Sequence, residues 1–164
     1  MNPLGGLYGR AAEFRRAWYG RHPERRRRLD RPVVSVGSLV VGGSGKTPTV
    51  AAIVRLLQAR GERPAILSRG YKRRSAAGDV VVVADGTTVL EPVSRSGDEP
   101  QMLARALTGV PVLVSADRYL AGQVAERQFG ASVHVLDDGF QHVRLCRDVD
   151  LVVRRSHLLD AGNV

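Results

Sequence analysis

A glycine-rich run that ends in lysine and threonine is the part of this sequence best suited to hold phosphate. A β-branched stretch at residues 33–37 leads into it, and a helix-like stretch follows it. Glycines allow successive backbone N–H groups to turn toward phosphate oxygens, and the N-terminus of the following helix favours an anion. The predicted nucleotide-binding residues are Val41, Gly42, Gly43, Ser44, Gly45, Lys46, Thr47 and Pro48.

Several of these side chains have separate expected roles. Lys46 would reach the β- and γ-phosphates, the Thr47 hydroxyl would bind Mg²⁺, and Pro48 suits the first helical turn. The usual pattern begins with glycine where this sequence has Val40, so the strict motif fails. The alternative is a glycine-rich turn that binds nothing. The flanking strand and helix, and the scarcity of lysine in an arginine-rich chain, favour nucleotide phosphates.

Two adjacent aspartates follow a hydrophobic strand later in the chain. Asp137 and Asp138 come directly after the predicted strand at residues 133–136. Ligands of open α/β sheets bind at the carboxyl ends of strands, so these carboxylates would hold Mg²⁺ opposite Thr47. Neighbouring strand-end side chains point in different directions, and we expect one aspartate to serve the metal and the other to position water or a side chain. The alternative is a solvated Asp-Asp-Gly turn.

Asp98 lies in a polar turn before a helix-like stretch that carries Met102, Leu103 and Leu107. An aspartate in such a place often caps its helix by accepting free backbone N–H groups. If the start of the helix faces the γ-phosphate, Asp98 is instead a general base for an acceptor hydroxyl. Sequence alone leaves both interpretations open. Further candidates for contacts with substrate or phosphate are Arg69, Glu99, Arg118, Gln141 and His142.

The elements that must position these residues alternate along the chain. From residue 31 onward, β-branched runs alternate with helix-like stretches, which predicts βαβ units. The expected fold class is α/β, a three-layer sandwich of P-loop NTPase type with a mostly parallel sheet over residues 32–164. The predicted strands are 33–37, 64–68, 79–84, 112–115, 133–136 and 149–153, and the predicted helices are 46–60, 98–107 and 117–129.

Residues 1–31 form a separate predicted segment. Apolar residues recur at helical spacing in its first part, and nine arginines against three acids give it a net charge of +6, out of +9 for the chain. An amphipathic helix followed by a run of arginines suits the headgroup layer of an anionic membrane. The alternative is a helix packed on the domain, with a solvated charge run beyond it.

The remaining composition excludes several classes of protein. The other 133 residues hold 16 basic and 13 acidic side chains, a balance that gives no reason to expect nucleic-acid binding. One cysteine, Cys146, excludes an internal disulfide framework and a cysteine-based zinc site, and it indicates a reducing cytosol. No apolar run approaches the roughly 18 residues that a membrane-spanning helix needs.

The motifs, taken in order, resemble the tetraacyldisaccharide 4′-kinase family, the lipid A kinases. The resemblance covers nearly the whole chain, and the family shares the shifted glycine pattern at Val40. The residues that carry it are 35–37, 42–48, 67–71, 97–100, 117–118 and 137–142, with Leu7, Tyr8, Gly9, Arg15 and Arg16 near the start.

This resemblance implies a peripheral kinase at the cytoplasmic face of the bacterial inner membrane. Members transfer the γ-phosphate of ATP to the 4′-hydroxyl of a tetraacylated glucosamine disaccharide phosphate, the lipid A precursor. By resemblance, Lys46 and Thr47 hold phosphate and Mg²⁺, and Asp98 is the base. Asp137 and Asp138 then serve the metal site and the transition state, and the N-terminal segment docks on the membrane.

Family members continue into a second, smaller subdomain, whereas this sequence ends at Val164. One alternative function is therefore a catalytically inactive piece that binds only membrane or nucleotide. Another is a different P-loop NTPase, such as a GTPase-like switch or a metallochaperone. No guanine-reading segment and no cysteine or histidine cluster supports that second alternative.

Overall fold

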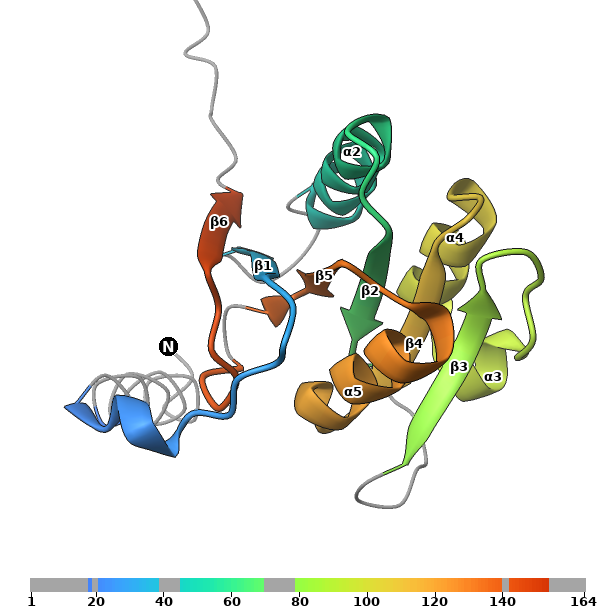
Figure 1. The fold of residues 1–164 in the computed structure, drawn as a ribbon. Helices are drawn as coiled ribbons and strands as arrows, with labels where there is room; N and C mark the ends of the chain where they lie inside the picture. Colours follow the sequence, from blue (N-terminus) through green and yellow to red (C-terminus); the bar gives the residue numbers. More distant parts are fainter. Residues whose placement is uncertain (1–17, 19–20, 39–44, 70–78, 140–141, 154–164) are drawn as a thin grey trace, which may run out of the picture.

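The fold is built on a six-stranded sheet with the strand order β3-β4-β2-β5-β1-β6 (Figure 1). It comes from a computed structural model that describes residues 18, 21–38, 45–69, 79–139 and 142–153. All neighbouring strands run parallel except β3, which is antiparallel to β4. The strands are β1 (Val33–Ser38), β2 (Pro64–Ser68), β3 (Val80–Asp85), β4 (Pro111–Ser115), β5 (Val133–Asp137) and β6 (Val149–Val153).

Helices cover both faces of this sheet. They are α2 (Lys46–Ala59), α3 (Val93–Ser96), α4 (Asp98–Ala106) and α5 (Arg118–Phe129), with a short 3-10 helix, η1 (Pro23–Arg25). One core cluster joins the apolar sides of α2 and α4 to one face of the sheet, and the other joins α5 to the opposite face. Figure 1 accordingly shows α2 and α4 on one side of the strands and α5 on the other. The predicted α/β sandwich with a mostly parallel sheet is confirmed.

The helix boundaries follow local chemistry. Asp117 caps α5, because its side chain accepts a hydrogen bond from the backbone N–H of Tyr119. Gly61 follows α2 with a φ of +81°, a left-handed conformation that allows a helix to end tightly. Each strand and helix predicted for residues 32–164 agrees with the structure to within one residue at either end, while the one-turn helix α3 was not predicted.

The chain that follows η1 is fastened to the α5 side of the sheet. Leu29 is buried in the same apolar cluster as α5. Arg27 forms an ion pair with Asp117 at 2.9 Å, and Arg28 forms one with Asp148 at 3.0 Å. The predicted amphipathic helix near the start of the chain lies outside the described residues. Among the residues that are described, no helix is long and apolar enough to cross a lipid bilayer.

Candidate nucleotide site

The ends of β1 and β5 meet the start of α2 at the carboxyl edge of the sheet. The strand register pairs Val36 of β1 with Asp137 of β5, so the chain leaves β1 for the phosphate loop beside the predicted acids. Gly45 precedes α2 with a φ of +75°, which glycine adopts without steric penalty. The strand order thus brings the loop lysine and the strand-end acids to one edge, where open α/β sheets bind their ligands.

Lys46 and Asp138 form an ion pair at this edge. Lys46 Nζ donates a hydrogen bond to Asp138 Oδ1 at 2.8 Å, and the two side chains are 21% and 49% exposed. Asp138 has a φ of +56°, and no other described residue besides glycine has a positive φ. Such a conformation costs on the order of 1–3 kcal/mol and is common at functional sites. Because the ion pair is partly exposed and such pairs are weak, a bound phosphate can replace the carboxylate as the partner of Lys46.

Close packing and one arginine hold the turn after β5 in place. A Cβ atom on Gly139 would lie 2.6 Å from Leu136 Cβ and 2.7 Å from Ser35 Oγ, so only glycine fits there without a shift of its neighbours. Arg147 Nη1 donates to the carbonyl oxygen of Gly139 at 3.1 Å, and its Nε pairs with Asp150 Oδ1 at 3.1 Å. Sequence reasoning missed Arg147, because no motif marks a side chain that supports a turn through a carbonyl.

Asp137 differs sharply from its neighbour in environment. Its side chain is 1% exposed, and burial raises its pKa to about 6. The nearby charges of Glu99 and Asp138 raise this pKa further, while Lys46 and Arg118 oppose the shift. Its Oδ2 atom has no hydrogen-bond partner among the described residues. A buried carboxylate oxygen without a partner is suited to a cation.

The residues predicted to hold Mg²⁺ fit that ion. Thr47 is the second residue of α2, and Asp137 and Asp138 offer one buried and one exposed carboxylate. Within the described ranges, no group of three or more His, Cys, Asp or Glu side chains could hold a metal by itself. Mg²⁺ commonly takes one or two carboxylates together with substrate phosphates and water. The donor set therefore suits a cation that arrives with a nucleotide.

The burial of Asp137 predicts a stability that falls as pH rises. Because the folded pKa of about 6 lies above the ordinary value of 3.8, the native state holds this proton more tightly than the unfolded chain does. The stability from the protonated carboxyl is present below pH 3.8 and is lost as pH rises through 6. Asp137→Asn has no carboxyl to titrate, so it avoids this loss. Its free energy of unfolding, relative to that of the wild type, should therefore rise by about 3 kcal/mol from the low-pH to the high-pH end of this window, at 1.36 kcal/mol per pKa unit. Urea unfolding at pH 3.5 and 7.5 measures the change, and a constant difference would contradict it.

Arg118 is buried at the start of α5 and lies near the strand-end acids. It is 3% exposed, and its Nη1 donates to the carbonyl oxygens of Ser115 at 3.0 Å and Ala116 at 3.3 Å. Burial lowers its pKa to about 10 and repulsion from Arg69 adds to this, so Arg118 stays charged at neutral pH. Its charge lowers the pKa of Asp137. This guanidinium is therefore buried against carbonyl oxygens beside the strand-end acids.

His142 lies on the turn that follows the two aspartates. Its backbone N–H donates to the carbonyl oxygen of Gly139 at 2.9 Å. Burial lowers the pKa of the His142 side chain to about 4, and the positive charge of Arg118 acts in the same direction. The imidazole is therefore neutral at physiological pH, so any contact that it makes with a phosphate comes from a neutral ring.

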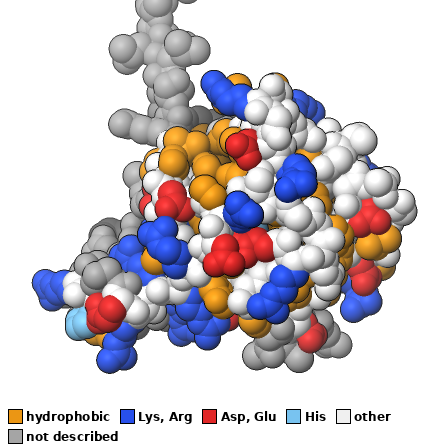
Figure 2. All heavy atoms as spheres, viewed as in Figure 1, with side chains coloured by type: hydrophobic (Ala, Val, Ile, Leu, Met, Phe, Trp, Pro, Cys, Tyr) orange, Lys and Arg blue, Asp and Glu red, His pale blue; other side chains and the backbone are white. Residues whose placement is uncertain are grey.

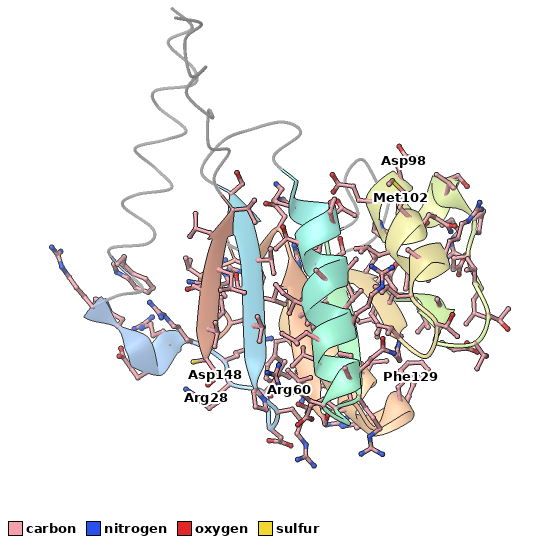
Figure 3. The ribbon with its side chains drawn as sticks, turned by 90° about the horizontal axis from the view of Figure 1, so that it is seen from above. Arg28, Arg60, Asp98, Met102, Phe129 and Asp148 are labelled. Carbon is pink, nitrogen blue, oxygen red and sulfur yellow. The ribbon has the colours of Figure 1, made fainter. Side chains whose placement is uncertain are left out.

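Asp98 does not cap its helix. The N-cap of α4 is Gly97, no side chain makes a capping hydrogen bond there, and Asp98 is the exposed first residue of the helix. The capping interpretation is therefore wrong. Figure 3 shows Asp98 at the same end of the molecule as the start of α2. The next residue, Glu99, is close enough to Asp137 to raise its pKa. The start of α4 thus lies near the carboxylates at the edge of the sheet.

Part of the predicted site falls outside the described residues. The residues concerned are Val41, Gly42, Gly43, Ser44 and Gln141. Their contacts with phosphate or substrate stay predictions. The structure does place the ammonium group of Lys46 at the start of α2, the carboxylates of Asp137 and Asp138 at the end of β5, and the start of α4.

These features define an α/β nucleotide-binding domain of the P-loop class. The comparison with protein families is more specific, because the family model for LpxK, tetraacyldisaccharide-1-P 4′-kinase, matches residues 1–160. The chain belongs to this family, as its motifs predicted.

Known relatives agree with this assignment. A tetraacyldisaccharide 4′-kinase from Geobacter sulfurreducens is 46% identical over 147 residues, which cover 90% of this chain and 41% of the relative. One from Pelobacter propionicus is 44% identical, covering 98% of this chain and 44% of the relative. A crystal structure of the "apo" form of LpxK from Aquifex aeolicus, in complex with ATP, matches 92% of this chain and 46% of that one, with a TM-score of 0.82 and 39% identity. This chain therefore spans less than half the length of these relatives.

Proposed function

We propose that the chain forms the nucleotide-binding and catalytic part of a kinase that transfers the γ-phosphate of ATP to the 4′-hydroxyl of a tetraacyldisaccharide 1-phosphate. One observation carries the proposal. Lys46 is paired with Asp138 beside the buried Asp137, where the phosphate loop enters α2. The family supplies the acceptor, and the relative from Aquifex aeolicus that was crystallised with ATP supports the choice of nucleotide.

On the nucleotide side, binding would rearrange the ion pair. Lys46 would exchange Asp138 for oxygens of the β- and γ-phosphates, as a compact ammonium at the start of a helix can. The released Asp138, the unpartnered Oδ2 of Asp137 and the Thr47 hydroxyl would then hold Mg²⁺. When bound, this ion neutralises the charge that develops on the phosphates. Positioning and electrostatics supply most of the catalysis in such reactions.

On the acceptor side, Asp98 would take the proton of the attacking hydroxyl. The 4′-oxygen forms a bond to the γ-phosphorus in line with the bond that breaks, and ADP leaves with that bonding pair. Asp98 is free of a capping role and lies at the end of the molecule where α2 begins (Figure 3). Its position therefore suits a base that meets the hydroxyl opposite the leaving group.

The test is transfer of γ-labelled phosphate from Mg·ATP to the acceptor, measured for this chain and for a version extended to the length of its relatives. We expect the chain to bind Mg·ATP and the extended version to transfer phosphate. Binding of ATP without transfer by either version would support the inactive alternative. Equal binding of GTP would support a different P-loop NTPase, and no nucleotide binding would refute the proposal.

We also propose that residues 1–31 dock the protein on the cytoplasmic face of the bacterial inner membrane. Figure 2 shows Lys and Arg side chains gathered around η1. Arg21 and Arg25 are exposed there, while Arg27 and Arg28 pair with acids of the domain. The exposed arginine charge suits anionic lipid, at about 1 kcal/mol for each basic residue near the surface.

Sedimentation with vesicles tests this docking. We expect binding to vesicles that contain phosphatidylglycerol, and loss of binding when residues 1–20 are removed and Arg21 and Arg25 are replaced by glutamine. Equal sedimentation with purely zwitterionic vesicles would contradict the electrostatic part of the proposal. Retained binding after both changes would contradict the role of the segment.

A further inference from the structure

The exposed face of α4 carries an acid, a thioether and a guanidinium in successive turns. Asp98, Met102 and Arg105 are spaced four and three residues apart, which places them on one face of a helix. All three are exposed, whereas Leu103 and Leu107 are buried on the side that packs on the sheet. The exposed face of the helix thus carries a stripe formed by Asp98, Met102 and Arg105, which begins at the proposed base.

Met102 is the unexpected member of this stripe. Its side chain is 61% exposed, more than that of any other large hydrophobic residue in the described part of the chain. A single exposed apolar side chain is ordinary in itself. What distinguishes Met102 is its position, one helical turn from Asp98 and at the end of the molecule where α2 begins (Figure 3).

We propose that this face of α4 binds the acylated sugar of the acceptor, with Met102 in contact with the acyl chain nearest the reacting hydroxyl. The inference rests on the proposed transfer to a tetraacyldisaccharide. Four acyl groups on two sugar rings place a chain within a few bonds of any free hydroxyl. Residues one turn apart on a helix have Cβ atoms about 5–6 Å apart. A hydroxyl held by Asp98 thus has its neighbouring chain within reach of Met102.

The chemistry of the side chains fits this occupant. Methionine is unbranched and polarizable, so it adapts to a flexible hydrocarbon better than a β-branched residue does. Arg105 lies seven residues after Asp98, about 10 Å further along the helix axis at a rise of 1.5 Å per residue. Its positive charge complements the phosphate that the disaccharide carries away from the reacting hydroxyl. Acid, apolar group and cation thus follow the order of hydroxyl, acyl chain and phosphate in the acceptor.

Methyl NMR of the 164-residue chain tests the contact directly. The chain has two methionines, Met1 and Met102, so methyl-labelled protein gives one reporter at the stripe and one remote from it in sequence. Met102→Leu identifies the Met102 signal by its disappearance. The probe is tetraacyldisaccharide 1-phosphate in neutral detergent micelles, added with a non-hydrolysable Mg·ATP analogue. The controls are the same micelles alone and micelles with phosphatidylglycerol.

The expected result is a shift or broadening of the Met102 signal with the acceptor micelles and not with either control. If the chain binds the acceptor and Met102 is unaffected, this inference is overturned while the proposed function stands. An equal response to phosphatidylglycerol also overturns it, because the contact would then be with any lipid. If neither the chain nor the version extended to the length of its relatives binds the acceptor, although both bind nucleotide, the acceptor assignment itself fails.

Two substitutions separate a contact from a structural effect. Met102→Gln keeps the length but adds polarity, and we expect about a ten-fold weaker acceptor affinity with unchanged nucleotide affinity. Met102→Leu should restore most of the acceptor affinity. Leu56→Gln is the matched control, because Leu56 is 52% exposed on α2 and lies outside the stripe. Equal losses in Met102→Gln and Leu56→Gln would contradict the proposal.

The arginine of the stripe has a test of its own. Arg105→Gln should weaken binding of the acceptor that carries the 1-phosphate and leave binding of the dephosphorylated acceptor unchanged. A substitution that weakens both equally would show that Arg105 does not meet the phosphate. Circular dichroism and the urea unfolding midpoint of each variant are compared with those of the wild type, to show that the fold is intact before affinities are compared.

Discussion

Lys46→Ala should reduce phosphate transfer by at least about 10²–10³-fold, the cost of removing one preorganised donor at a developing charge. It should also weaken Mg·ATP binding, because the loop loses its cation at the phosphates. Lys46→Arg should restore little of the rate, because the guanidinium fork is broader than an ammonium and meets phosphate with different geometry. Isothermal titration with Mg·ATP and single-turnover transfer measure the two effects separately.

This substitution should leave the fold nearly unchanged, which makes the result interpretable. The pair between Lys46 and Asp138 is partly exposed, and such pairs contribute about 0–1 kcal/mol to stability. Arg60→Ala is the matched control, because Arg60 lies at the other end of α2, far from the proposed site (Figure 3). Wild-type Mg·ATP affinity in Lys46→Ala would refute the assignment of this lysine to the phosphates.

The layout of the sheet and the place of the site could be predicted because both depend on short-range signals. Alternation of β-branched and helical runs indicated the βαβ units, and a parallel sheet places the carboxyl ends of its strands at one edge. That rule predicts Lys46 and Asp138 at one edge, although they are 92 residues apart. That their side chains meet depends on β1 and β5 being neighbours in the sheet. The start of a helix directly after Gly45 was likewise predicted, from the glycine-rich run that ends there and the helix-like stretch that follows.

Properties that depend on the third dimension could not be predicted. The sequence shows two adjacent aspartates, but only the structure shows that Asp137 is buried and that Asp138 turns back with a positive φ. Apolar periodicity groups Met102 with Leu103, yet packing against the sheet buries Leu103 and leaves Met102 exposed. A helical pattern identifies an apolar residue and does not say which side of the helix has a neighbour.

The two carboxylates have different electrostatic roles in the site, because Asp137 is buried and Asp138 is half exposed. Asp137 lies where its charge is costly, so a cation that binds there relieves an existing penalty. Asp138 is half exposed and already has a partner in Lys46, so it can exchange partners at little cost. Binding of Mg·ATP can thus release Asp138 from Lys46 and, at the same time, give the buried Asp137 a cation as its partner.

Asp98→Asn should lower the rate of transfer by about 10²–10⁴-fold, the usual contribution of a general base. The ATP affinity should be unchanged, because Asp98 lies on α4 and not on the phosphate loop. An asparagine keeps the shape of the side chain but cannot accept the proton of the acceptor hydroxyl. The measurement is the rate constant at saturating ATP and acceptor, in a form of the protein that transfers phosphate, together with ATP titration.

The stability of this variant distinguishes the base from a structural acid. Asp98 makes no capping hydrogen bond, so its replacement costs only the favourable effect of a negative charge in the first helical turn, about 0.3–1 kcal/mol. Glu62→Gln provides a matched loss of charge at an exposed residue just before β2, at the opposite edge of the sheet, and should transfer phosphate at the wild-type rate. If Asp98→Asn keeps its turnover, or loses it only because α4 unfolds, then proton acceptance must be assigned to a different group. Loss of the general base lowers the rate alone, whereas unfolding of α4 also lowers the unfolding midpoint. The rate, the ATP affinity and the unfolding midpoint together therefore distinguish these two causes.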